Sequence, residues 1–435
     1  MPMRYSHSPN QQNLFSFERV GFCLKDHALT KLSEQIPWQE LVDLIKTQYS
    51  DNGRNCKSIR MMIALELAKT MYRMSDEQAV ARLKTDAALM KFCGFNSPLQ
   101  VETPDSSSLT NFRKKLTPEI AKKISDLSAL RAIEKLPPRK RTQVSADTTC
   151  LPINLAYPTD TALLTKVASK LDEVAQQARE QGQAVVLRGK RKVNKIIKKF
   201  KMVCKKTKEQ INTIKREVIE FAKHNTKNLE KIKNTLSRQS KKKLTTIKKI
   251  IDQQEQLLKD SKAKIKDRII SFHEPNVRAI HRGKGQHRQF EFGLKGSVIS
   301  VGQKIVISGE LSTNNIPDSS LVKKDLERFK QVTGRKTKEY SSDRGYHSPE
   351  NHKLLEQEGV HDGIMYRGKI PKKAKLPPKN KLKRMYRQRA QVESRIGILK
   401  NCYGLDKINY KSENAHVKFE LAVAINNFKV SASYS

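Results

Sequence analysis

The chain has 435 residues, enough for roughly two or three domains, and its 37% hydrophobic content excludes a disordered polycation. Its formal net charge of +42 predicts a polyanionic partner, first of all nucleic acid. No apolar run is long enough to span a bilayer, no secretory pattern is present, and the six cysteines form no CxxC pair. We therefore expect a cytoplasmic protein without a membrane partner, a disulfide framework or a structural zinc site.

Residues 1–130 are predicted to form an N-terminal helical domain. Apolar residues recur at helical spacing from Ile59 onward, and Ser75 is a good helix N-cap. A later amphipathic run ends in a basic cluster that includes Arg113 and Lys114. Short helices with a basic last member suit a DNA-binding domain, in which these two side chains would contact DNA, but they also suit a plain helical cap.

A proline-rich basic linker at residues 131–141 leads to a predicted strand, TQVSADTTC, whose side chains alternate between two faces. Asp147 is unusual in this strand because aspartate is disfavoured inside strands. It is either a functional carboxylate or a strand-end residue that makes local turn hydrogen bonds.

Residues 161–275 are expected to form a Lys-rich helical insertion. Apolar residues recur at near-heptad spacing around residues 211–221 and 244–265, which predicts long amphipathic helices in an antiparallel coiled hairpin. The lysines are either the solvated face of this coil or an arm that follows a phosphate backbone, and the one-sided charge favours the arm.

After residue 289 the apolar pattern has a period of two. The expected elements are a hairpin that turns at residues 301–303, a helix at 318–332, a short strand that ends at Asp343, a helix at 349–358 and a strand at 363–366. With the strand of Asp147 they predict an α/β domain, a mixed sheet flanked by helices, over residues 140–160 and 280–410. Residues 411–435 would be a C-terminal helix or tail.

The segment KRMYRQRAQVESRIGILKNCYG, residues 383–404, is the most informative one. Its apolar residues form one stripe of a helix, which Gly404 would end. Tyr386, Glu393 and Lys400 are spaced by seven and stack along one face, and Arg389 lies one turn before Glu393. A surface helix with an Arg389–Glu393 pair would show the same spacing.

Three carboxylates, Asp147, Asp343 and Glu393, belong to this predicted sheet and its last helix. Ligands of open α/β sheets gather beyond strand ends, and hard cations such as Mg²⁺ prefer carboxylate oxygens. Two such ions would activate an attacking oxygen and stabilise a leaving one in phosphodiester chemistry. Three more carboxylates, which match no motif, are weaker candidates for the same role: Glu291, Glu310 and Asp318.

Two further segments are also weaker candidates. His347, His352 and His361 could suggest zinc, but their spacing fits no metal motif, so surface histidines are favoured. Residues 282–288, RGKGQHR, suit either a phosphate-contacting loop or a flexible linker.

Together these motifs resemble the bacterial insertion-sequence transposases of the DDE class, whose catalytic core is ribonuclease-H-like. The family signature Tyr-x2-Arg-x3-Glu-x6-Lys is present as Tyr386, Arg389, Glu393 and Lys400. The segments DRGY at residues 343–346 and SADTTC at 145–150, with AYPTD after it, are similar to the two aspartate motifs. Residues 56–116 are similar to the family's N-terminal helical domain, so the resemblance covers most of the chain except the insertion.

The resemblance implies a transposase that cleaves double-stranded DNA at terminal inverted repeats and joins the 3′ ends to target DNA. It would act as a homo-oligomer on the bacterial nucleoid, with Mg²⁺ or Mn²⁺ as cofactor. The implied metal ligands are Asp147, Asp343 and Glu393, and the implied DNA contacts are Tyr386, Arg389, Lys400 and Arg344. Many relatives carry an inserted domain between the second aspartate and the glutamate. Here the extra sequence precedes the second aspartate, which leaves the mode of end processing open.

Two other functions fit the same residues. The first is a two-metal nuclease without strand transfer. The second is a basic architectural nucleic-acid-binding protein, or a decayed transposase without catalysis.

Overall fold

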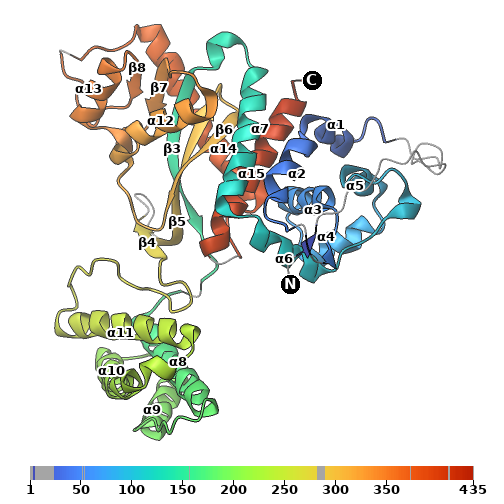
Figure 1. The fold of residues 1–435 in the computed structure, drawn as a ribbon. Coiled ribbons are helices and arrows are strands. Elements are labelled where there is room, and N and C mark those ends of the chain that lie inside the picture. Colours follow the sequence, from blue (N-terminus) through green and yellow to red (C-terminus); the bar gives the residue numbers. More distant parts are fainter. Residues whose placement is uncertain are drawn as a thin grey trace. The chain divides into compact units, whose positions relative to one another are not determined.

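The computed structural model (Figure 1) describes residues 3–4, 24–50, 52, 54–155, 157–281, 290–372, 374–409 and 412–434. The chain forms two compact units, which are Met1–Ile153 with Lys295–Ser312 and Ile316–Ser435, and Asn154–Leu294 with Thr313–Asn315. The predicted helical domain and most of the predicted catalytic domain fall within the first unit, while residues 154–160 and 280–294 of the latter belong to the second, so the boundary near residue 130 stays a prediction. The segment 282–288 lies outside the described residues.

The first unit contains a mixed sheet with the strand order β6-β5-β3-β7-β8. Strands β3, β7 and β8 are parallel, whereas β5 and β6 form the predicted antiparallel hairpin. The last strand begins two residues earlier than predicted. The bounds are β3 Gln143–Pro152, β5 Phe290–Val301, β6 Ile305–Ser312, β7 Glu339–Ser342 and β8 His361–Ile364.

One face of this sheet is apolar. Val144 and Ala146 of β3 and Tyr340 of β7 are buried there. They pack with apolar side chains from α7 (Pro118–Glu134), α12 (Val322–Thr333) and α13 (Pro349–Gln357). The alternation of the strands sends the intervening polar side chains to the opposite face.

Helix α14 (Lys379–Tyr403) contacts β3 and β7 and ends at Gly404, whose φ of 71° suits glycine. Gln388 donates to Gln143 on β3 (Nε2 to Oε1, 2.9 Å), and Arg384 donates to Glu339 on β7 (2.6 and 2.8 Å). These bonds confirm the predicted helix and fix it at the polar face of the sheet.

The remaining helices of the first unit form its N-terminal part and its end. Ser75 closes the capping box of α4, as predicted. Helix α3 is buried on almost every side, and the C-terminal helix α15 contacts α7, α3 and β6. The helix bounds are α1 Ala28–Gln35, α2 Trp38–Lys46, α3 Ile59–Tyr72, α4 Asp76–Leu83, α5 Ala87–Phe92, α6 Ser106–Lys115 and α15 Ser412–Ala432. Two short strands, β1 Met3–Arg4 and β2 Arg54–Asn55, pair in parallel.

The second unit includes the residues of the predicted Lys-rich insertion. It consists of α8 Asp160–Glu180, α9 Lys190–Met202, α10 Lys208–Lys231 and α11 Arg238–Lys259, which share one apolar core. Helices α10 and α11 contact each other across a short connection, as the predicted hairpin requires, and α8 packs on both. Strand β4 (Arg278–His281), which the sequence did not predict, pairs with the start of β5.

Among the described residues, no helix combines the length and the apolar character needed to cross a bilayer.

Candidate active site

The register of β3 and β7 brings two of the predicted carboxylates to the same face of the sheet. Ser145 and Ser341 are aligned on these parallel strands, and their hydroxyl oxygens are 2.7 Å apart. Asp147 and Asp343 each lie two residues after these serines. Strand alternation therefore places both on the face that α14 covers. Asp343 directly follows the carboxyl end of β7, and ligands of α/β sheets bind beyond such ends, so the position suits a functional pair.

The electrostatics of Asp147 indicate that this pair is closely coupled. Burial and the neighbouring charge of Asp343 raise the pKa of Asp147 to about 7. A hydrogen bond from the Thr148 backbone N–H to Oδ1 (2.7 Å) and the charge of Arg389 act in the opposite direction. Two carboxylates that repel each other at a buried site are a donor set that a divalent cation would stabilise.

The turn after β7 holds the second aspartate in place. The Gly345 N–H donates to Asp343 Oδ1 (2.8 Å), and Arg367 donates to the carbonyl oxygens of Arg344 (Nε, 2.7 Å) and Gly345 (Nη2, 3.3 Å). A Cβ at Gly345 would lie only 2.7 Å from Asp318 Oδ2 and 2.9 Å from Asp343 Oδ1. Arg367 was not predicted from the sequence, because it follows a strand end with no motif around it.

Asp318 lies beside this pair, although it matches no motif in the sequence. It accepts a hydrogen bond from Thr148 (Oγ1, 2.8 Å) and forms an ion pair with Lys295 (Nζ, 2.7 Å). Its charge also raises the pKa of Asp147, after burial and the charge of Asp343. Glu310, in contrast, pairs with Lys324 (2.6 Å), and Glu291 belongs to the second unit. Asp318 is thus a third carboxylate at the site, already bound to a cation of the chain.

Glu393 does not form a metal-binding group with Asp147 and Asp343 in the described structure. Its side chain is 61% exposed and forms an ion pair with Arg389, one turn earlier on α14. Arg389 also contacts the sulfur of Met365 (4.0 Å). Within the described ranges, no group of three His, Cys, Asp or Glu side chains is close enough together to hold a metal ion. The structure therefore brings together Asp147 and Asp343, and it leaves Glu393 with a competing partner.

The other residues of the predicted signature lie on α14 or next to the site. Tyr386 and Lys400 are half-buried on α14, and Arg344 is exposed in the turn after Asp343. Lys114 is exposed and donates to Asn111 (2.9 Å). The DNA contacts assigned to these side chains stay predictions.

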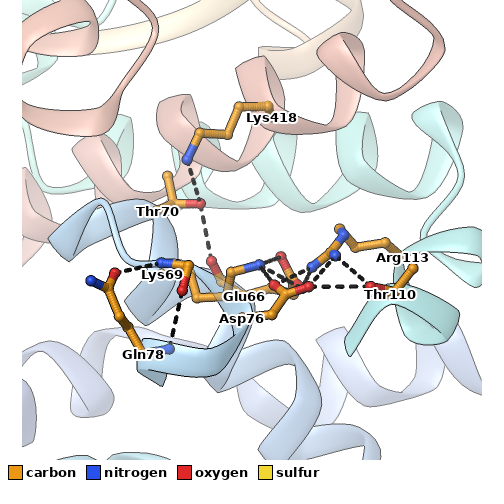
Figure 2. A network of polar contacts seen from close by, with 9 residues as sticks. Glu66, Lys69, Thr70, Asp76, Gln78, Thr110, Arg113 and Lys418 are labelled. Carbon is orange, nitrogen blue, oxygen red and sulfur yellow. Dashed lines mark hydrogen bonds and ion pairs between the residues drawn. The ribbon is translucent and has the colours of Figure 1, made fainter. Parts of the chain in front are cut away.

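Arg113 has a different environment from the one expected of a DNA contact. It binds Glu66 (2.6 Å) and Asp76 (2.5 Å), and its side chain is only 12% exposed. Figure 2 shows these groups with Lys69, which pairs with the same two carboxylates. These ion pairs favour a structural role for Arg113 among the packed helices. The predicted DNA contact of Arg113 stays untested.

The histidines after Asp343 differ from the favoured surface interpretation. His347 and His352 are partly buried and hydrogen bonded to each other, whereas His361 is exposed. The described residues contain no metal-binding group around them, so the structure gives a zinc site no support.

Comparison with known proteins identifies the family. Residues 19–115 match the family described as Transposase domain (DUF772), and residues 268–426 match the Transposase DDE domain. The chain belongs to the insertion-sequence DDE transposases. This transposase is also 30% identical over 167 residues to the "Uncharacterized protein ORF8 in nfe locus" of Rhizobium meliloti, which covers 38% of this chain and 80% of that protein. No solved structure matches.

The family assignment fits the architecture. The mixed sheet with flanking helices is consistent with the ribonuclease-H-like fold of DDE domains. The matched regions include Asp343 and Glu393 but leave out residues 116–267, and so Asp147. For Asp147 the argument therefore rests on the strand register and on its coupling to Asp343. Transposases bind DNA, and DDE transposases generally use divalent metals.

Proposed function

We propose that this transposase cleaves double-stranded DNA at the terminal inverted repeats of its own element and joins the 3′ ends to target DNA. The observation that carries the proposal is the placement of Asp147, within β3, and Asp343, just after the end of the neighbouring parallel strand β7, on one face of the sheet. Asp147, Asp343 and Glu393 would hold Mg²⁺ or Mn²⁺, which supplies Lewis-acid stabilisation of the oxygens in phosphodiester cleavage and transfer.

Glu393 has to leave Arg389 before it can join the aspartates. An exposed i,i+4 ion pair contributes only about 0.3–0.5 kcal/mol, so a competing ligand can separate it at little cost. A DNA phosphate is such a ligand for a guanidinium, with which it forms charge-assisted bonds. Arg389 would then bind the backbone near the scissile bond, while its former partner turns toward Asp147.

The DNA strand would be held by side chains that surround this face. Tyr386, Lys400 and Arg344 are the proposed contacts, and Arg367 adds a cation that is already fixed by the turn of Asp343. A guanidinium that is positioned by backbone carbonyls and still exposed can bind a phosphate without losing much conformational entropy.

Helix α9 is the proposed phosphate-tracking surface of the insertion. It contains no acidic residue, and its apolar side chains Val193 and Ile197 are buried in the core of the second unit. On its outer side, exposed cations form no ion pair within the described part of the chain; they are Arg191, Lys195, Lys198, Lys199 and Lys201. By contrast, Lys223 on α10 and Lys248 on α11 are neutralised by Glu255 and Glu230. Unpaired cations in one stripe suit a phosphate backbone.

The decisive experiment is cleavage of a labelled duplex that bears the element's own terminal repeat, with Mg²⁺ or with EDTA. We expect nicking at the repeat boundary only with Mg²⁺, and its loss in Asp147→Asn, Asp343→Asn and Glu393→Gln with DNA binding retained. Metal-dependent cleavage that survives in all three variants would refute the site. Joining of pre-cleaved ends to a target plasmid separates a transposase from a simple nuclease, and binding without any cleavage in the wild type would favour an architectural or decayed protein.

A further inference from the structure

Two histidines and an aspartate form a hydrogen-bonded chain: His347 follows the turn of Asp343, His352 is on α13, and Asp362 is near the start of β8. His347 Nδ1 lies 2.8 Å from His352 Nε2, and His352 Nδ1 is bonded to Asp362 Oδ2. The ring of Tyr366 stacks on His352, with centroids 4.1 Å apart and planes 7° apart, and also lies 5.1 Å from His347. All of these residues belong to the first unit.

The inner end of the chain is fixed. The side chain of Asp362 is 9% exposed and that of His352 is 13% exposed. The second carboxylate oxygen of Asp362 accepts from the Ile364 N–H (2.9 Å). An ionised carboxylate can only accept, so His352 must donate from Nδ1, and the tautomer of the whole chain follows from that bond.

This bonding gives the chain two proton states. In the first, His347 donates from Nδ1 to His352, and the outer His347 Nε2 is an acceptor. In the second state, His347 has taken up a proton from water at Nε2. The proton between the rings has moved from His347 Nδ1 to His352 Nε2, so the outer His347 Nε2 is now a donor. The added positive charge then lies on His352 beside the Asp362 carboxylate, which compensates it.

The outer end of the chain is next to the proposed catalytic turn. Asp343 caps the short helix Arg344–Tyr346, and His347 directly follows that helix. Burial, His352 and the charge of Arg367 all lower the pKa of His347, so the chain is in its acceptor state in the free protein at neutral pH. Besides Asp362 and Tyr366, the titratable groups that face it are Arg367 from the same turn region and Tyr386, which is coupled to Tyr366 from α14.

We propose that His347 is a ligand for a backbone phosphate of bound DNA, and that the Asp362–His352–His347 chain takes up one proton from solvent when the phosphate binds. A phosphate oxygen only accepts hydrogen bonds, so it requires the donor state of Nε2, whereas the free protein holds the acceptor state. The inference rests on the proposed function in one respect, which is that the phosphate belongs to DNA.

Isothermal titration of the full-length protein with the terminal-repeat duplex tests this, in EDTA so that no strand is cut. The titration is done at neutral pH in two buffers of different ionisation enthalpy, and the difference in observed enthalpy gives the number of protons taken up. We expect uptake of about one proton by the wild type and an affinity that falls up to about tenfold per pH unit above the pKa of the chain. His347→Gln and Asp362→Asn should bind DNA without this uptake.

His361→Gln is the matched control, because this exposed histidine is next to Asp362 in sequence but lies outside the chain, and it should keep the full uptake. Asp362→Asn tests the buried end of the chain, and His347→Gln tests its accessible end with little risk to folding. Uptake that is absent in the wild type, or that persists in His347→Gln, overturns the inference while the proposed function stands. A duplex that does not bind at all, at low salt, removes the proposed function itself.

Discussion

Arg113 separates two interpretations of the N-terminal helices, because a DNA contact and a core ion pair respond differently to its removal. In the structure it neutralises Glu66 and Asp76, whose side chains are 4% and 16% exposed. Arg113→Met keeps most of the aliphatic stem and removes the charge, so Lys69 is left to compensate both carboxylates. Lys418, which is coupled to Glu66, can compensate only part of the loss, because burial lowers its pKa to about 8.

Removal of one partner from a buried ion pair costs about 3–5 kcal/mol. We expect the low end, about 3 kcal/mol, because Lys69 remains in contact with both carboxylates. Urea unfolding, monitored by circular dichroism, measures this loss. Lys114→Met is the matched control: Lys114 is exposed and, among the residues that the structure describes, bonded only to Asn111, so its removal should change the unfolding free energy by less than about 0.5 kcal/mol.

DNA binding of the folded variants completes the test. A structural Arg113 predicts an unchanged slope of log affinity against log salt concentration, since no phosphate contact is lost. If Arg113→Met unfolds like the wild type and its salt slope is reduced by about one, the ion-pair argument is wrong and Arg113 is a DNA contact.

Three other perturbations follow from the same geometry. Gly345→Ala should abolish cleavage but not folding or DNA binding, because its Cβ would displace Asp318 or Asp343, and circular dichroism with the cleavage assay checks both. Burial raises the pKa of Asp325 from 3.8 to about 7, so between these values the folded state keeps a proton that the unfolded state has lost. The free energy of unfolding should therefore fall as the pH rises from about 4 to 7. Asp325→Asn should flatten this dependence in urea titrations. Replacing four of the five outer cations of α9 by Gln, at Arg191, Lys195, Lys198 and Lys199, should lower the salt slope of DNA binding by about 3–4. The same change at Lys223 and Lys248 should leave the slope unchanged.

Local patterns in the sequence predicted most elements of the first unit. The strand of Asp147, the hairpin, α14 and its end at Gly404 all depend on periodicity and caps within one segment. Strand alternation could also assign Asp147 to a face of its strand. Strand alternation could not show that β7 lies next to β3. The alignment of Ser145 with Ser341 joins two segments that are separated in the sequence by the whole insertion. The sequence therefore singled out Asp147, Asp343 and Glu393 as candidates, but it could not show which of them lie close together.

The missed features are all long-range contacts. Helix α3 was predicted from apolar residues at helical spacing, but the spacing did not show that it is buried on nearly every side, because α2, α15 and other helices surround it. Strand β4 exists through its pairing with β5, and its own residues carry little strand signal. Arg113 is on the helix where the sequence placed it, yet its partners come from α3 and the start of α4. Helical spacing shows which residues share a face, but not what faces them.

Local pairing determines which of the many cations can bind DNA. A net charge of +42 predicts a polyanionic partner, but a cation that is already paired with a buried carboxylate contributes little to phosphate binding. Arg113 is of this kind, whereas within the described residues the outer cations of α9 form no ion pair and Arg367 donates only to carbonyl oxygens. Arg389 is intermediate, because its partner Glu393 is exposed and is itself needed at the proposed metal site. Exchange of that partner for a DNA phosphate would satisfy both groups, so DNA binding and completion of the carboxylate site would occur together.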